Sequence, residues 1–197
     1  SIIYNIAKVR SRTSKGGYCM PALIAYYSRA DENYFGGTLR YIDKGNTRIA
    51  AEILQALTGA DIVRLDTKVP YSDDYDAVVA QGKREVEKHF RPEIKPLGVD
   101  ISDYDVIAVG TPTWWYTMAP AVLTFLSGND FSGKTVIPFM TNAGWTGTVI
   151  KDMTKESKVQ TAFAKEFLFD SDGGSNMQTS QAELEQWINE VKSFVNK

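Results

Sequence analysis

The sequence has few of the residues from which disulfide frameworks, zinc clusters and triad-type catalytic sites are built. Its 197 residues include one cysteine, Cys19, and one histidine, His89. A disulfide framework needs paired cysteines, a zinc cluster needs several thiolate or imidazole ligands, and a Cys–His or Ser–His pair needs a suitably placed histidine. We therefore interpret Cys19 and His89 as solvated or packed side chains and expect none of these sites.

A strong charge imbalance and a long apolar run are also missing. The chain carries 22 Lys and Arg residues against 24 Asp and Glu residues, so its net charge at pH 7 is -2. Such a balance gives no basic field for nucleic acid. No apolar stretch approaches the roughly 20 residues of a membrane helix, and residues 1–20 lack the apolar centre of a signal peptide. We expect no nucleic-acid partner, no membrane span and a reducing, cytoplasmic compartment.

The sequence does contain enough apolar surface for one domain, since 43% of its residues are apolar and 12% are aromatic. Residues 1–20 show only a short alternation of apolar and polar residues, and we treat them as an N-terminal extension. From residue 21 onward, short apolar runs alternate with amphipathic segments. We therefore place a single domain at residues 21–197.

Within this domain, apolar runs predict strands and periodic segments predict helices. The predicted strands cover residues 22–27, 62–65, 106–109, 135–140 and 162–169, the last being an edge strand. The predicted helices begin near Gly45, Asp73, Pro120, Thr148 and Ser180. The alternation predicts an α/β fold with a five-stranded parallel sheet, helices on both faces and strand order 2-1-3-4-5. In that order, the loops after the first, third and fourth strands face one crevice.

Two of these loops carry residues suited to a ligand. Ser28 ends the first strand, and residues 45–47 open the first helix, where backbone amides and the helix dipole favour a monophosphate. Alone, the Gly-Asn-Thr sequence is more often an ordinary helix cap, but its place after the first strand favours a phosphate site. After the third strand, aromatic residues 114–116 suggest a flat ligand, although Trp and Tyr at strand ends are often only packing.

Together, the loops resemble those of the flavodoxin family. The similar segments are residues 22–28, 45–47, 111–116 and 141–145, and the resemblance covers residues 21–197. It implies a three-layer flavodoxin-like sandwich that binds FMN noncovalently, with the phosphate in the first loop and the isoalloxazine between the second and third. The cofactor-binding residues that it implies are Ser28, Arg29, Lys44, Gly45, Asn46, Thr47, Thr111, Pro112, Thr113, Trp114, Trp115, Tyr116, Thr141, Asn142, Ala143, Gly144, Trp145 and Gly147.

The chain departs from the family in its phosphate loop, which normally reads Thr-x-Thr-Gly-Asn-Thr without interruption. Here residues 29–44 are inserted between Ser28 and Gly45. The insertion carries several aromatic residues and could fold as a small hairpin over the crevice or decorate the surface. Arg29 and Lys44 are candidates to replace the missing threonine through charge-assisted contacts with the phosphate.

The aromatic loop offers several contacts to a flavin. If the loop is extended, Trp114 and Trp115 point to opposite sides, so at most one of them faces the ring. We favour Trp114 near the ring edge, with Trp145 or Tyr116 stacked on the exposed face. Backbone amides from residues 142–147 suit the pyrimidine edge. No catalytic dyad is expected, because the flavin carries the redox chemistry.

Two functions compete within this fold, and a third lies outside it. A flavin-dependent oxidoreductase would pass electrons from NAD(P)H to a quinone-like or other small acceptor, with a homodimer as one option, and the insertion could shape its pocket. An electron carrier would dock a partner redox protein, usually through a markedly acidic surface, whereas this chain is only mildly acidic. A flavin-free binding module would need broken loops. We favour the oxidoreductase slightly over the carrier.

One more motif, residues 128–135, matches the nucleotide-binding pattern G-x-x-x-x-G-K-[ST] in full. A phosphate-binding P-loop leaves a strand and enters a helix, so that backbone amides and the helix dipole converge on the phosphates. Here the motif follows a predicted helix and precedes a predicted strand, on the edge of the sheet opposite the crevice. We therefore interpret it as a turn.

The substitution Lys134→Ala is expected to leave the affinity for FMN unchanged, because this lysine lies away from the predicted crevice. ATP should bind neither the parent protein nor the variant. Flavin fluorescence titration and calorimetric titration with ATP test the two expectations. A measurable ATP dissociation constant that the substitution abolishes would contradict both the interpretation of the motif and the predicted topology.

Overall fold

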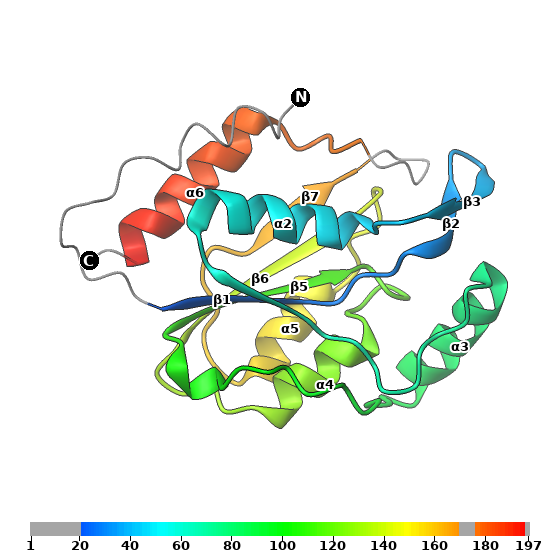
Figure 1. The fold of residues 1–197 in the computed structure, drawn as a ribbon, viewed down its shortest axis with the longest axis horizontal. Coiled ribbons are helices and arrows are strands. Elements are labelled where there is room, and N and C mark those ends of the chain that lie inside the picture. The colour runs from blue at the N-terminus through cyan, green and yellow to red at the C-terminus, as the bar shows by residue number, and fades with distance from the viewer. Residues whose placement is uncertain (1–20, 170–175, 196–197) are drawn as a thin grey trace.

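The computed structural model describes residues 21–169 and 176–195, so the predicted N-terminal extension lies outside the described residues. The described chain forms a five-stranded parallel sheet in the order β4-β1-β5-β6-β7 (Figure 1). Its strands are β1 (Ala22–Tyr26), β4 (Asp61–Arg64), β5 (Val106–Pro112), β6 (Thr135–Asn142) and β7 (Lys165–Leu168). Counted along the chain, this order is 2-1-3-4-5, which confirms the predicted topology.

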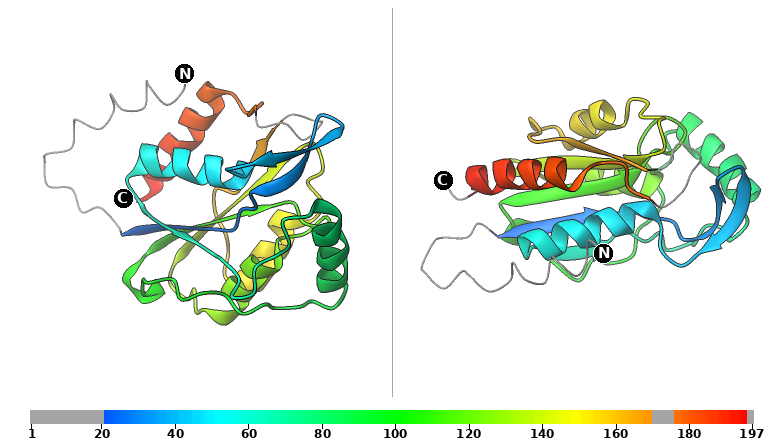
Figure 2. Two further views of the ribbon diagram at one scale, coloured as in Figure 1. Left: turned by 45° about the vertical axis from the view of Figure 1, so that its right-hand side comes forward. Right: turned by 90° about the horizontal axis from the view of Figure 1, so that it is seen from above.

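Helices cover both faces of the sheet (Figures 1 and 2). One face carries α2 (Asn46–Thr58) and α6 (Gln181–Val195), and the other carries α4 (Pro120–Gly128) and α5 (Val149–Ser157). Helix α3 (Tyr75–Glu87) stands near the carboxyl ends of the strands, and a short 3-10 helix (Ile101–Asp103) precedes β5. None of the described helices is long and apolar enough to cross a membrane.

The central strands bury side chains on both faces. In β1, Leu23 and Ala25 belong to the apolar cluster under α4 and α5, whereas Ile24 and Tyr26 belong to the cluster under α2 and α6. Successive side chains of a strand point to opposite faces, so a strand covered on both sides needs a continuous apolar run. This is why the apolar runs predicted the strands, and the outcome is the expected three-layer sandwich.

The predicted edge strand at residues 162–169 is shorter in the structure. It lies at the edge of the sheet as expected, but β7 begins only at Lys165. Phe163 has a φ of 52°, a left-handed conformation that an extended strand does not contain. The prediction was therefore wrong at the start of the strand, because the apolar character of a residue does not report its backbone conformation.

The insertion folds as a hairpin, one of the two alternatives left open by the sequence. Its strands are β2 (Asp31–Phe35) and β3 (Thr38–Ile42), which form a two-stranded antiparallel sheet of their own. Gly36 and Gly37 make the two-residue turn with φ values of 54° and 81°, a turn type in which both residues must be left-handed. The hairpin lies beside α3 at the carboxyl edge of the sheet (Figures 1 and 2).

The motif at residues 128–135 connects α4 to β6, in the order helix, turn, strand. It therefore lies at the start of β6, on the edge of the sheet opposite the loops that follow the strands. The Lys134 ammonium donates to the backbone carbonyl of Tyr104 at 2.7 Å, just before β5 begins. The interpretation of this motif as a turn is confirmed. Its lysine links the segment before β6 to the segment before β5.

Gly110 in β5 lets an aromatic ring of the neighbouring strand pack directly against the backbone. A Cβ at this position would lie 2.1 Å from Cζ of Phe139. Gly110→Ala is therefore expected to lower the free energy of unfolding by about 1–3 kcal/mol, the usual cost of overpacking a core. The matched control is Gly128→Ala, since no atom lies within 4 Å of the place where its Cβ would stand. Urea denaturation measures both, and equal stabilities would contradict the close packing.

Candidate functional site

A cavity of about 530 Å³ opens where β1, β5 and β6 end. Its volume is in the range of pockets that hold small molecules and cofactors. Most of the predicted binding residues line it: Ser28, Arg29, Gly45, Asn46, Thr47, Pro112, Thr113, Trp114, Trp115, Tyr116, Thr141, Asn142, Ala143 and Trp145. The other four, Lys44, Thr111, Gly144 and Gly147, lie outside the lining.

One end of the cavity is formed by the start of α2. A Cβ on Gly45 would lie 2.1 Å from the carbonyl oxygen of Arg29 and 2.5 Å from Oγ of Ser28, so only glycine lets these segments pass so closely. Ser28 Oγ accepts a hydrogen bond from the Arg48 amide at 3.1 Å. The first amides of a helix have no partner within the helix, and its dipole attracts negative charge there.

Arg29 follows Ser28 and brings a positive charge to the cavity. Its guanidinium donates to three backbone carbonyls, those of Glu32, Ser72 and Asp73. Its Nε is buried and has no hydrogen-bond partner, and no carboxylate among the described residues pairs with the guanidinium. A helix amino terminus, a serine hydroxyl and a guanidinium without a counter-ion are donors that a monophosphate accepts. The residues present therefore fit the phosphate of FMN.

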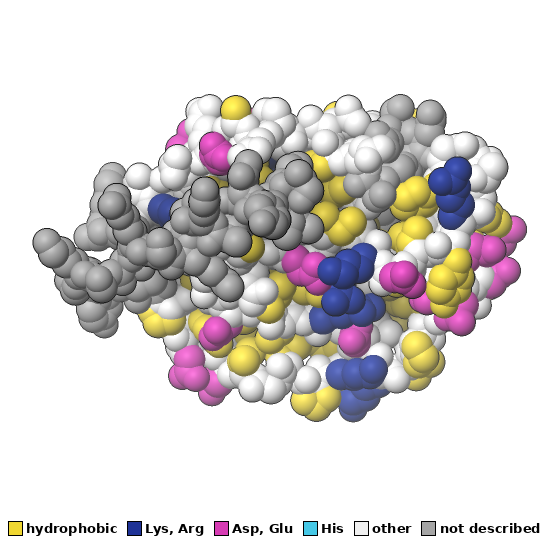
Figure 3. All heavy atoms as spheres, turned by 45° about the horizontal axis from the view of Figure 1, so that its top comes forward, with side chains coloured by type: hydrophobic (Ala, Val, Ile, Leu, Met, Phe, Trp, Pro, Cys, Tyr) yellow, Lys and Arg dark blue, Asp and Glu magenta, His cyan; other side chains and the backbone are white. Residues whose placement is uncertain are grey.

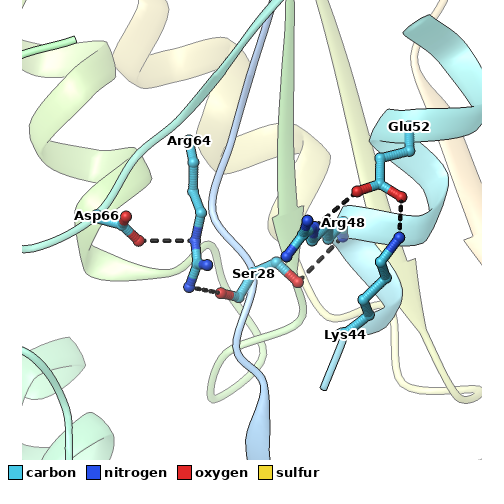
Figure 4. Close-up of polar contacts among 6 residues, drawn as sticks. All are labelled: Ser28, Lys44, Arg48, Glu52, Arg64 and Asp66. Atoms are coloured by element: carbon cyan, nitrogen blue, oxygen red, sulfur yellow. Dashed lines mark hydrogen bonds and ion pairs between the residues drawn. The ribbon is translucent and has the colours of Figure 1, made fainter. Parts of the chain in front are cut away.

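Lys44, the other candidate for a phosphate contact, is engaged outside the cavity (Figure 4). Its ammonium pairs with Glu52 at 2.7 Å, and Arg48 pairs with the same carboxylate at 2.7 Å. Partial burial raises the pKa of Glu52, but the hydrogen bonds and charges of the two cations outweigh it and leave the pKa below its usual value. On the other side of Ser28, Arg64 donates to the serine carbonyl at 3.1 Å. Lys and Arg side chains also gather in the middle of one face of the molecule (Figure 3).

The aromatic loop after β5 is a tight turn, so the condition of an extended loop, under which Trp114 and Trp115 would alternate, does not hold. The amide of Trp114 donates to the carbonyl of Thr117 at 2.8 Å, and the amide of Thr117 donates back at 3.1 Å. Between them, Trp115 and Tyr116 have φ values of 48° and 65°. Two left-handed residues between a hydrogen-bonded pair are typical of a type I′ β-turn, the turn that joins the two strands of many β-hairpins. This turn, and not strand alternation, decides where the three aromatic rings point.

Trp114 turns into the core, although part of it still lines the cavity. Its ring lies 5.8 Å from that of Tyr27 and 5.4 Å from that of Tyr71. A Cβ on Gly82 of α3 would lie 2.5 Å from its indole nitrogen, so the helix packs on it through a glycine. Burial, reinforced by the hydrogen bond to Glu85, raises the pKa of Tyr71 above its usual value. These closely packed rings form a floor under the cavity.

Trp115, Tyr116 and Trp145 are the exposed aromatic side chains at the cavity, with exposed fractions of 38%, 56% and 64%. The Trp115 indole N–H donates to the carbonyl of Val79 at 2.9 Å, which fixes that ring against α3. The Lys83 ammonium lies 5.7 Å from the centre of the same ring, within the range of a cation–π contact. Tyr116 and Trp145 have no such anchor among the described side chains, so they are the rings free to cover a flat ligand.

The third loop is tied to the other two by hydroxyl groups. Thr141 Oγ1 lies 2.7 Å from Thr47 Oγ1, and both side chains are buried. The Thr113 hydroxyl donates to the carbonyl of Trp145 at 2.8 Å. Asn142 Oδ1 accepts from the Gly144 amide at 2.8 Å and so shapes the loop from within. These bonds set the spacing between the first, second and third loops.

Two of the predicted residues outside the lining act as supports. The buried Thr111 hydroxyl accepts a hydrogen bond from the Ala119 amide at 2.9 Å, at the start of α4. A Cβ on Gly147 would lie 2.1 Å from the carbonyl oxygen of Tyr116, so this glycine lets the third loop approach the second. Thr111 and Gly147 therefore support the loops around the cavity without lining it.

The sequence did not single out the wall that the hairpin and α3 form. It consists of hairpin and α3 residues that were not predicted to bind: Asn33, Tyr34, Phe35, Ile42, Tyr75, Val78 and Val79. The aromatic character of the insertion was the only signal in the sequence. Nothing local predicts that α3, which follows β4, shares a cavity with the insertion that follows β1.

Comparisons with known proteins agree with this geometry. The sequence model of a family described as Flavodoxin matches residues 39–191, which is more than half of the chain. No curated protein matches the sequence. Many solved structures are similar in fold, and the following three are among them. One, from Bacteroides eggerthii and provisionally classed as a flavoprotein, is 25% identical with a TM-score of 0.64, over 89% of this chain and 98% of that one.

The second structure, of the same provisional class and from Bacteroides uniformis, is 24% identical with a TM-score of 0.62, over 89% of this chain and 99% of that one. The third is a flavoprotein from Lactobacillus acidophilus in complex with FMN. It is 18% identical with a TM-score of 0.58, over 85% of this chain and 98% of that one. At such low identities the second and third structures support the fold alone.

The hydroxyl of Thr47 is predicted to matter for the phosphate of a flavin. Thr47→Val keeps the volume of the side chain but removes the hydroxyl that bonds Thr141 beside the start of α2. FMN affinity should fall about tenfold, the effect of losing one hydrogen bond at a charged ligand, while riboflavin affinity changes much less. Thr58→Val, at the other end of α2, is the control. Flavin fluorescence titration measures the affinities, and equal losses for both flavins would contradict a phosphate role.

Proposed function

Because this chain belongs to the flavodoxin family, whose sequence model matches residues 39–191, we propose that it is an FMN-binding oxidoreductase. It passes electrons from NAD(P)H to a quinone-like or other small acceptor. One observation supports this more than any other: a single cavity joins the amino terminus of α2 to exposed aromatic rings at the ends of β5 and β6. A phosphorylated ligand with a flat ring needs both surfaces within one site.

The phosphate of FMN would be held by Ser28, by the amides of residues 45–47 and by Arg29. The similar structure from Lactobacillus acidophilus contains FMN, which agrees with this proposal at the level of the fold. When bound, the flavin supplies the transfer of hydride or single electrons. The protein's part is to hold the phosphate, orient the ring and limit its contact with water.

Specific side chains of the second and third loops are suited to the last two tasks. Tyr116 and Trp145 expose more than half of their surface, so covering a flat ring removes apolar area from water and stabilises the complex. Trp114 is fixed in the core and gives the ring a support that does not move. Backbone groups of Asn142 and Ala143, which line the same cavity, are placed for the polar edge of the ring.

An enzyme is favoured over a carrier because the cavity extends beyond the three loops. It continues to Asn33 and Phe35 of the hairpin and to Val79 of α3. A carrier needs only an exposed edge of the flavin for electron transfer to a protein, whereas a reductase needs space for a second small molecule. The part of the cavity that borders the hairpin and α3 offers that space.

The carrier remains the second candidate because acidic side chains gather beside the cavity. The hairpin and the segment that leads into α3 include Asp31, Glu32, Asp73, Asp74 and Asp76. Asp and Glu side chains are seen together at the end of the molecule where the hairpin and α3 lie (Figure 3). A basic redox partner would be attracted to such a surface, with an association rate that falls as salt increases.

Anaerobic stopped-flow mixing with NADPH or NADH separates the two functions. For an oxidoreductase we expect the absorbance of the bound flavin to bleach directly, and menadione to restore it over many turnovers. An unreduced flavin after prolonged incubation, together with fast and salt-sensitive reduction by a partner reductase, would establish the carrier instead. A purified protein without bound flavin, and without affinity for FMN, would contradict both functions and leave a flavin-free binding module.

A further inference from the structure

The wall of the cavity formed by the hairpin and α3 includes a pair of tyrosines. Tyr34 of the hairpin and Tyr75 of α3 stack with their ring centres 6.4 Å apart and their planes 28° from parallel. Both line the cavity, and Tyr34 has an exposed fraction of 49%. Two phenol rings from segments 41 positions apart thus stack on each other, and both border the ligand space.

This pair is held in place by polar contacts at the base of the hairpin. The Glu32 carboxylate accepts a hydrogen bond from the Tyr75 amide at 3.0 Å, and the Glu32 amide donates to the carbonyl of Asp73 at 3.3 Å. The Arg29 guanidinium donates to the carbonyls of Glu32 and Asp73 from the other side. The hairpin and the start of α3 are therefore fastened together, and the tyrosine pair is positioned before any ligand arrives.

The chemistry of the lining favours a neutral ligand at this wall. Among the residues that the structure describes, no carboxylate lines the cavity, and the one charged lining residue, Arg29, follows Ser28 and has its terminal nitrogens already bonded to carbonyls. Around the tyrosine pair the lining is apolar or aromatic, with Phe35, Ile42 and Val79. A cation placed here would meet the like charge of Arg29, and the terminal nitrogens of that guanidinium are already occupied by backbone carbonyls.

The two hydroxyl groups define what the ligand must carry. Among the described residues, neither the Tyr34 nor the Tyr75 hydroxyl has a hydrogen-bond partner, so both are available to donate. Burial raises the pKa of Tyr75 despite the opposing charge of Arg29. A planar ring with carbonyl oxygens would suit the aromatic rings and the donors together.

We propose that Tyr34 and Tyr75 form the acceptor site of this protein and that its ligand is a neutral quinone. The inference rests on the proposed function, because the quinone must lie in the same cavity as the flavin. The quinone is the oxidant: it takes up two electrons and two protons and leaves as the hydroquinone. NAD(P)H is the reductant, which would supply both electrons and one proton as hydride by way of the flavin and leave as NAD(P)⁺, and solvent water would supply the second proton. The hairpin insertion thereby acts as the part of the chain that selects the acceptor.

The test uses binding rather than turnover. Equilibrium dialysis of menadione against the oxidised, FMN-loaded protein measures the dissociation constant without any reaction. Tyr34→Ala should raise this constant about two- to tenfold, the effect of losing one aromatic stacking partner, and leave the FMN dissociation constant unchanged. Tyr34→Phe keeps the ring and should show a smaller loss.

Tyr41→Ala is the matched control. Tyr41 lies on the same hairpin with an exposed fraction of 67%, stands outside the lining and bonds Asp31 at 2.9 Å. Its replacement should leave menadione binding unchanged.

Three results would overturn the inference: menadione binds the Tyr34→Ala variant as tightly as the parent, Tyr41→Ala weakens it equally, or Tyr34→Ala weakens FMN as well. A protein that cannot bind FMN contradicts the proposed function. A protein that binds FMN but not menadione contradicts only the acceptor site.

Discussion

Helices cover both faces of the parallel sheet, and this constraint places the functional loops of the molecule. Parallel strands need a crossover after each strand, so the loops that leave β1, β5 and β6 all emerge at one edge of the sheet. Thr47 and Thr141 are 94 positions apart in sequence, yet their hydroxyl oxygens lie 2.7 Å from each other. The anion site, the aromatic turn and the third loop come together because two apolar faces had to be buried.

Arg29 connects the two ends of the cavity. Its carbonyl oxygen lies against Gly45 at the start of α2, while its guanidinium binds the carbonyls of Glu32 and Asp73. A residue that follows β1 thus holds both the anion site and the tyrosine wall. Because its charge has no carboxylate partner among the described residues, a bound phosphate would supply the counter-ion and tighten both ends together.

The aromatic turn stores conformational strain at the site. Trp115 and Tyr116 both adopt left-handed backbone conformations, which cost on the order of 1–3 kcal/mol for residues other than glycine. The cost is offset by the burial of Trp114 in the core and by the hydrogen bond from the Trp115 indole to α3. In return, Tyr116 is presented to the cavity from a loop that cannot relax into an extended form.

The sequence alone determined the fold, because continuous apolar runs specify strands buried on both faces and periodic segments specify the helices between them. It also predicted a phosphate site, since Gly45 and Thr47 follow the first strand and open a helix, and it showed that residues 128–135 are a turn. It did not determine the orientation of Trp114, which depends on two left-handed backbone conformations, or the start of β7, which Phe163 sets. Only the tertiary structure placed Tyr34 beside Tyr75, because that contact joins a hairpin after β1 to a helix after β4. Local sequence patterns do not specify which distant segments line the same cavity.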